Sequence, residues 1–212
     1  MNKKRKISLS ISICSLAAFL VWTILVRIID RQAIGPNDSI VGFATLNQKV
    51  HELFGVHMFL YDITDLLSII PLAIVLGFGV LGLVQWIKRK KLFSIDRDII
   101  ALGLFYVAVF VAFISFEVLV INYRPILIEG VLEASYPSST TMLAMCVLPT
   151  AAMQIRSRIR NKAFKECVFY LTVVFTVFMV VARLISGVHW FTDIIGGALL
   201  STGLVTMYYT YK

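Results

Sequence analysis

Long apolar runs separated by short polar segments repeat along the whole chain. A helix that crosses a bilayer needs about 20 mostly apolar residues, and strands rarely exceed about 10 residues, so runs of this length predict helices. The third and fifth runs are rich in the β-branched and aromatic residues of strands, but their length favours helix. The fourth run is the shortest. The six predicted spans are residues 8–29, 66–87, 99–121, 139–155, 167–186 and 190–210.

The composition agrees with a membrane protein. Hydrophobic residues make up 59% of the 212 residues and charged residues 15%, whereas a soluble domain has roughly 45–50% and about 25%. This balance excludes a soluble domain, a disordered chain and a fibrous protein. The length fits one domain. The predicted fold is therefore all-α: residues 1–212 form a single integral-membrane domain, a bundle of six transmembrane helices.

The basic residues, which dominate a net charge of +8, gather in alternate connections between the spans. They precede the first span, separate the second from the third, and separate the fourth from the fifth. Because Lys and Arg are retained on the cytoplasmic side, both termini are predicted to be cytoplasmic. The clusters lack interleaved aromatic residues, so no nucleic-acid partner is expected. The pattern is typical of a multi-pass protein of a bacterial plasma membrane.

Two segments near the N-terminus each allow more than one interpretation. The first apolar run resembles a signal peptide in its basic start, but it exceeds the usual apolar core of about 7–15 residues, so an uncleaved helix is predicted. The outer loop 31–65 carries side chains near a helical period. A short helix there could lie on the membrane surface or pack over the bundle. These side chains are Phe43, Leu46, Val50, Leu53, Phe54 and His57.

Two ionisable residues stand at the start of the last span, where such groups are costly and mark functional sites by default. His189 and Asp193 are four residues apart, so both project from one face of a helix. A carboxylate so placed accepts the proton of one imidazole nitrogen and leaves the other as a nucleophile or base. The alternative is a polar pair with a structural role.

Phosphate-binding groups occur in the same outer connections. Arg124 and Arg183 are guanidiniums in cation-poor segments, and arginine binds phosphate through two parallel hydrogen bonds. Ser138, Ser139 and Thr140 precede the fourth apolar run and predict a helix N-terminus with free N–H groups, which attracts phosphate; taken alone, they are an ordinary cap. Together with the oriented histidine, these groups describe a phosphoryl-transfer site. No metal and no cofactor are expected, because no cluster has metal-ligand spacing.

These motifs resemble the type-2 phosphatidic acid phosphatases, membrane relatives of the vanadium haloperoxidases. The family pattern is Lys-x6-Arg-Pro, then Pro-Ser-Gly-His, then Ser-Arg-x5-His-x3-Asp. The residues of this sequence that match it are Arg124-Pro125, Pro137-Ser138, Arg183, His189 and Asp193. Four positions depart from the pattern: Glu117 replaces the Lys, Ser139 the Gly, Thr140 the His, and Ala182 the Ser.

The resemblance implies a mechanism for this chain. His189 is expected to attack phosphorus and form a phosphohistidine, with Asp193 as its orienting partner. Arg124 and Arg183, together with Ser138 and neighbouring backbone N–H groups, are expected to hold the phosphate oxygens as charge develops. The expected substrate is a lipid phosphate in the bilayer, of the phosphatidic acid, phosphatidylglycerophosphate or polyprenyl diphosphate class.

The family's second-motif histidine protonates the leaving group, a step that Thr140 cannot perform at neutral pH. General acid catalysis contributes about 10²–10⁴-fold, and three alternatives follow from its loss. In the first, another outer residue supplies the proton, and Glu133 is the nearest in sequence. In the second, the leaving group needs no proton, as for a diphosphate lipid. In the third, the chain is a weak or inactive relative that binds or transports phospholipids. The candidate acids are Glu129, Glu133, His51 and His57.

Overall fold

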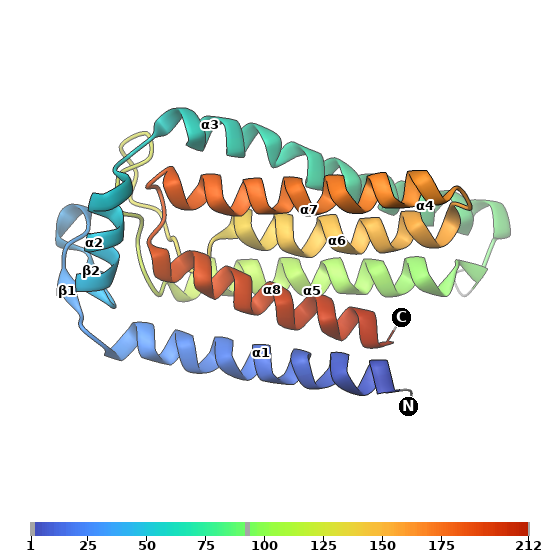
Figure 1. The fold of residues 1–212 in the computed structure, drawn as a ribbon, viewed down its shortest axis with the longest axis horizontal. Helices are drawn as coiled ribbons and strands as arrows, with labels where there is room; N and C mark the ends of the chain where they lie inside the picture. The colour runs from blue at the N-terminus through green and yellow to red at the C-terminus, as the bar shows by residue number, and fades with distance from the viewer. Residues whose placement is uncertain (1–2, 92–93, 212) are drawn as a thin grey trace.

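Six helices of 20 residues or more lie side by side along one direction in the computed structural model, which describes residues 3–91 and 94–211 (Figure 1). This arrangement confirms the predicted all-α membrane bundle. The six helices are α1 (Lys3–Ile28), α4 (Ile69–Arg89), α5 (Arg97–Leu119), α6 (Ser139–Arg158), α7 (Lys162–Ile185) and α8 (Phe191–Tyr211).

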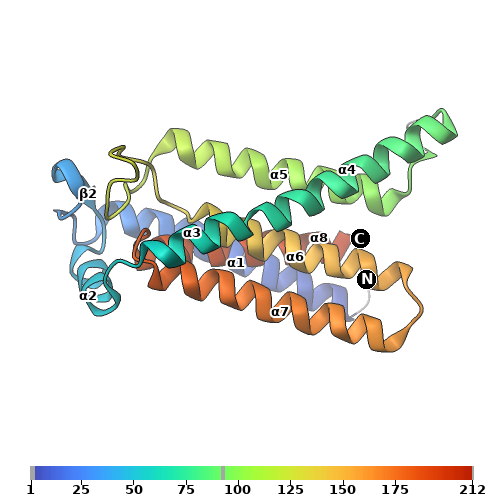
Figure 2. The ribbon, with the colours of Figure 1, turned by 90° about the horizontal axis from the view of Figure 1, so that it is seen from above.

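A further helix, α3 (Met58–Leu67), leads directly into α4, and the two cross the bundle obliquely as one segment (Figure 2). The segment Met58–Arg89 has 32 residues and is apolar enough to span a membrane. The apolar window began this span only at residue 66, because Asp62 and Asp65 lower the mean hydropathy of the first turns. The outer loop is therefore shorter than the sequence suggested.

Helix α6 is the most enclosed of the long helices and the least apolar. The five helical segments of the described chain that are long and apolar enough to span a membrane are α1, α3–α4, α5, α7 and α8. Helix α6 packs against α4, α5, α7 and α8, and Thr141, Thr150 and Gln154 on it are fully buried. Because neighbouring helices shield it from lipid, it tolerates polar residues that a lipid-facing helix does not.

Helix α1 packs along α8, so the two ends of the chain lie together (Figure 1). The Ser12 hydroxyl donates to the carbonyl oxygen of Gly203 at 2.8 Å, and the Ser8 hydroxyl donates to that of Thr206 at 2.9 Å. A Cβ at Gly203 would lie 2.6 Å from the Leu16 side chain. The absence of a side chain at Gly203 therefore lets the two backbones approach closely.

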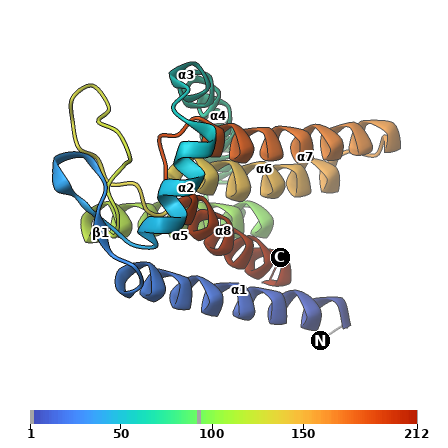
Figure 3. The ribbon, with the colours of Figure 1, turned by 60° about the vertical axis from the view of Figure 1, so that its left-hand side comes forward.

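The end of the bundle opposite the termini, here called the site end, consists of residues 30–57, 120–138 and 186–190. It carries η1 (Pro36–Asp38), helix α2 (Ala44–Phe54) and an antiparallel pair of short strands, β1 (Gln32–Ala33) and β2 (Ile40–Val41). Helix α2 lies across the ends of the long helices (Figure 3). It packs over the bundle through the fully buried Ala44 and Asn47, while Leu53 remains 76% exposed.

The connection between α5 and α6 is a β-hairpin-like loop, which the sequence analysis did not predict. Tyr123 pairs with Ala134, and the Arg124 N–H donates to the carbonyl oxygen of Glu133 at 3.0 Å. At the tip, Glu129 and Gly130 have φ angles of 50° and 78°, as in the two-residue turns that favour tight hairpins. The hairpin places Arg124 opposite Glu133.

Candidate active site

His189 lies in the short turn between α7 and α8, where its side chain is almost fully buried. The turn depends on Gly187, whose φ of 71° favours glycine. A Cβ at Gly187 would also collide with the carbonyl oxygen of Gly55. The N–H of His57 donates to the carbonyl oxygen of Ser186 at 3.0 Å. The segment before α3 therefore holds the turn that carries His189.

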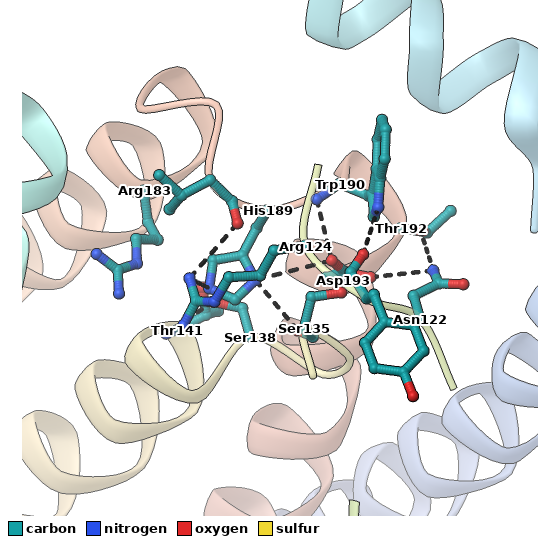
Figure 4. Close-up of polar contacts among 12 residues, drawn as sticks. Asn122, Arg124, Ser135, Ser138, Thr141, Arg183, His189, Trp190, Thr192 and Asp193 are labelled. Carbon is teal, nitrogen blue, oxygen red and sulfur yellow. Dashed lines mark hydrogen bonds and ion pairs between the residues drawn. The ribbon is translucent and has the colours of Figure 1, made fainter. Parts of the chain in front are cut away.

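The two ring nitrogens of His189 face different partners (Figure 4). Nδ1 lies 3.1 Å from the carbonyl oxygen of Ser135 and 3.7 Å from Asp193 Oδ2, and Nε2 lies 3.4 Å from Arg124 Nη1. A guanidinium can only donate, so Nε2 accepts and the proton resides on Nδ1. Burial, reinforced by the charges of Arg124 and Arg183, holds the pKa of His189 well below its usual value. The imidazole is therefore neutral, with its Nε2 lone pair directed at Arg124.

The Asp193 carboxylate lies in the first turn of α8 and is inaccessible to solvent. Its Oδ2 accepts from the Trp190 N–H at 3.0 Å, and its Oδ1 accepts from Asn122 Nδ2 at 3.3 Å. At 3.7 Å, the His189–Asp193 contact exceeds ordinary hydrogen-bond length. The Ser135 carbonyl is thus the closer acceptor for the Nδ1 proton, and Asp193 contributes mainly a nearby negative charge.

The Arg124 guanidinium lies between Glu133 and the turn that carries His189. Its Nε forms an ion pair with Glu133 Oε2 at 2.9 Å, and its Nη1 donates to the carbonyl oxygen of Val188 at 3.5 Å. The Arg124 side chain is 9% exposed and that of Glu133 is 42% exposed. Glu133, the predicted alternative acid, therefore lies on the more open side of Arg124.

Arg183 is buried in the last turn of α7 and contacts α3. Its Nη1 donates to Thr64 Oγ1 at 3.0 Å, its Nη2 lies 3.9 Å from Asp65 Oδ1, and its Cζ lies 4.7 Å above the Tyr61 ring. In Figure 4 the Arg183 guanidinium lies to one side of the Arg124 and His189 side chains, and it does not separate them. Among the residues that the structure describes, no hydrogen-bond partner is found for its buried Nε atom, so Arg183 retains an unused donor.

The N-terminus of α6 begins next to Asp193, as the Ser138 N–H donates to the Asp193 carbonyl oxygen at 3.1 Å. The Ser138 side chain is the cap and accepts from the Thr141 N–H at 3.4 Å. Thr140 is buried nearby, whereas Ser139 lines an apolar cavity of about 260 Å³ between α4, α5 and α6. The three predicted hydroxyls therefore do not share one environment.

The remaining candidate acids have other surroundings. The His51 ring packs against the Trp190 ring with centroids 5.5 Å apart, and burial lowers the pKa of His51. His57 Nε2 lies 2.7 Å from the Phe54 carbonyl oxygen, and Glu129 is exposed at the hairpin tip. Glu117, at the family's Lys position, lies in the last turn of α5.

Sequence reasoning missed the residues that hold the catalytic candidates in place. Ser135 acts through its backbone carbonyl, which no pattern of side chains reveals. Asn122 and Thr64 act through side chains that contact Asp193 and Arg183. Both residues are polar and stand beside apolar spans. Because buried polar groups require hydrogen-bond partners, this position in the sequence was a signal that they could bind other polar side chains.

Comparisons with known proteins agree with this fold. The family model described as the PAP2 superfamily matches residues 8–212. The structure is similar to the crystal structure of "the first transmembrane PAP2 type phosphatidylglycerolphosphate phosphatase from Bacillus subtilis", with a TM-score of 0.66, 18% sequence identity and coverage of 94% of each chain. No curated protein matches the chain.

Proposed function

Since the chain belongs to the PAP2 superfamily, as its motifs suggested, we propose that it is a phosphatase that removes phosphate from a membrane lipid through a phosphohistidine on His189. One observation carries this proposal. The buried, neutral imidazole has its Nδ1 proton directed at Ser135 and its Nε2 lone pair directed at Arg124.

In the proposed first step, Nε2 of His189 attacks phosphorus and forms a P–N bond. The bond from phosphorus to the leaving oxygen breaks, and its electron pair departs with that oxygen. Nδ1 keeps its proton, so the phosphorylated ring gains positive charge beside the Asp193 carboxylate, 3.7 Å away. A water molecule then attacks phosphorus, the P–N electron pair returns to Nε2, and phosphate leaves after the water loses a proton to solvent.

The phosphate oxygens have candidate donors on three sides. Arg124 lies next to Nε2, and the N-terminus of α6 begins at Ser138. Arg183 has a buried Nε for which the described part of the chain provides no hydrogen-bond partner. Hydrogen-bond donors aimed at developing negative charge account for a large part of the rate in many enzymes. Ser139, which lines the apolar cavity, is better placed to contact the lipid than the phosphate.

The leaving group decides which lipid is the better substrate. Thr140 provides no imidazole acid, and Glu133 is engaged by Arg124. A lipid monophosphate leaves without protonation far more readily than an alkoxide does. We therefore expect a polyprenyl diphosphate to react faster than phosphatidic acid or phosphatidylglycerophosphate. Comparable rates for the monoesters would instead indicate a proton donor, for which Glu133 is the candidate.

The charge pattern supports an outward-facing site. The basic clusters lie near the ends of helices opposite the site end, and Lys and Arg are retained on the cytoplasmic side. The proposal therefore places both termini in the cytoplasm and the site at the outer face of the plasma membrane.

The test is phosphate release by purified protein in detergent, measured with all three lipids for the parent, His189→Ala and His57→Ala. His57 lies at the site end but is bonded to Phe54, so its variant is the matched control. We expect release that requires His189 only, together with an acid-labile protein phosphate in the parent. Absence of release from every lipid, even after Thr140→His, would favour a relative that binds or transports phospholipids.

A further inference from the structure

Asn122 connects three segments of the site end. Its Nδ2 donates to Asp193 Oδ1 at 3.3 Å and its Oδ1 accepts from the Gly42 N–H at 3.3 Å. Its backbone carbonyl accepts from the Ser135 N–H at 2.9 Å. One residue, 1% exposed, thus contacts the strand segment before α2, the second arm of the hairpin and the first turn of α8.

The orientation of the Asn122 amide follows from its neighbours. The Gly42 backbone N–H can only donate, so the oxygen of the amide must face Gly42 and the nitrogen must face Asp193. A carboxylate accepts, so the donor and acceptor roles agree on both sides. The amide is also neutral at every accessible pH, and it therefore supplies a permanent donor to the buried carboxylate.

Both groups that face the Nδ1 proton of His189 depend on Asn122. The Ser135 carbonyl, 3.1 Å from Nδ1, belongs to the residue whose N–H is bonded to the Asn122 backbone. The Asp193 carboxylate, 3.7 Å from Nδ1, is bonded to the Asn122 side chain. Among the described residues, no hydrogen bond joins the Asn122 side chain to Arg124 or Arg183, so its effect on the phosphate would be indirect.

We propose that Asn122 is a positioning residue: its side-chain amide holds Asp193 so that His189 keeps its proton on Nδ1 and its Nε2 unprotonated. The proposal rests on the proposed function of His189 as nucleophile. Partners of this kind, which orient a group that does chemistry, are worth about 10–100-fold in activity at metal sites, and we expect a similar effect here.

Asn47 offers a matched control. It is also fully buried at the site end, where its Nδ2 donates to the Gly42 carbonyl oxygen at 2.8 Å and to Thr192 Oγ1 at 3.0 Å. Its Oδ1 accepts from the Thr192 N–H at 3.2 Å. Asn122 also contacts Gly42, and its Nδ2 lies 3.5 Å from Thr192 Oγ1. The two amides therefore share these neighbours, but the bond to Asp193 is made by Asn122.

The first measurement is nuclear magnetic resonance of protein labelled with ¹⁵N at histidine. The chain has three histidines, and His189→Ala assigns the signal of interest. Asn122→Leu removes the donor, and Asn122→Asp keeps the shape of the side chain but places an acceptor against Asp193. We expect both variants to shift the ring-nitrogen resonances of His189, whereas Asn47→Leu leaves them in place and lowers only the melting temperature.

The second measurement is the rate of phosphate release. Asn122→Leu should lower kcat about 10–100-fold with KM within about twofold of the parent, because KM follows phosphate contacts that Asn122 does not make. Unchanged His189 resonances in both Asn122 variants would overturn the inference, as would equal changes in Asn47→Leu. A parent protein that releases no phosphate would overturn the proposed function alone, because the resonance measurement requires no turnover.

Discussion

Replacing Asp193 by Asn separates two roles that a carboxylate beside a histidine can have. If the carboxylate sets the tautomer, its loss costs about 10⁴-fold, as in serine proteases. In this protein, the Ser135 carbonyl is the closer acceptor, so the tautomer should survive and only the charge is lost. Two unit charges 3.7 Å apart attract by about 4.5 kcal/mol at an effective dielectric constant of about 20. Asp193→Asn should therefore lower kcat by no more than about 2,000-fold.

The assay is kcat for phosphate release from a polyprenyl diphosphate in detergent micelles, with melting temperature measured in parallel. The second measurement is needed because the new amide directs a donor at either Trp190 or Asn122, which costs about 1–3 kcal/mol of stability. Thr192→Val is the control: Thr192 is equally buried in the same turn, and the change leaves the carboxylate in place. It should lower the melting temperature and leave kcat within a few-fold of the parent.

Two results would refute this reasoning. A loss below about tenfold would mean that the developing charge on His189 does not interact with Asp193, despite their separation of 3.7 Å. A loss of about 10⁴-fold or more in a folded protein would mean that Asp193, not the Ser135 carbonyl, sets the tautomer.

Four further predictions concern the leaving group, the arginine partner, pH and the turn before α8. Thr140→His should raise kcat for phosphatidic acid by about 10²-fold and leave that for a diphosphate lipid nearly unchanged; an equal rise for both would contradict the leaving-group argument. Glu133→Gln should lower KM for both lipids alike, because it removes a negative charge beside Arg124. The control Glu129→Gln should leave KM unchanged, and selective loss of monoester turnover in Glu133→Gln would instead make Glu133 the proton donor. Since the pKa of His189 lies well below its usual value of 6.5, phosphate release should not decline with an apparent pKa near 6.5 on acidification. As the pH falls below 6.5, residue 189 is protonated in the unfolded chain but not in the folded one, which favours unfolding. The melting temperature should therefore decrease from pH 7 to pH 5, and it should decrease less in His189→Gln. Gly187→Ala should lower the melting temperature more than Gly130→Ala, because both have positive φ but only Gly187 meets a neighbouring backbone; equal decreases would argue against that close approach.

The parts of the fold that the sequence predicted are those that depend directly on whether residues are apolar or polar. Apolar runs predicted the bundle because lipid requires an apolar surface. The same rule made the fourth span the shortest, because Thr150 and Gln154 on α6 face other helices rather than lipid. It also left most of α3 in the outer loop, because Asp62 and Asp65 lower the mean hydropathy of that segment. The hairpin between α5 and α6 had only Glu129-Gly130 as a turn signal.

The candidate site divides in the same way. His189, Asp193 and Arg124 are side chains with recognisable chemistry and spacing, and the structure brings them together. The Ser135 carbonyl could not be predicted, because every residue has one and only the tertiary fold selects which carbonyl faces the imidazole. The contacts of Arg183 with α3 likewise depend on how distant segments meet.

The packing of α1 along α8 has a consequence for biosynthesis. The ribosome produces α1 before α8, so the surface of α1 that carries Ser8, Ser12 and Leu16 has no partner in the bilayer until α8 has been inserted. The turn with His189 precedes α8, and the Trp22 indole N–H of α1 donates to the Thr192 carbonyl oxygen at 3.1 Å. A nascent chain in which α8 has not yet been made therefore has neither the partner of α1 nor a complete site. A complete site therefore requires that α8 has been synthesised and inserted.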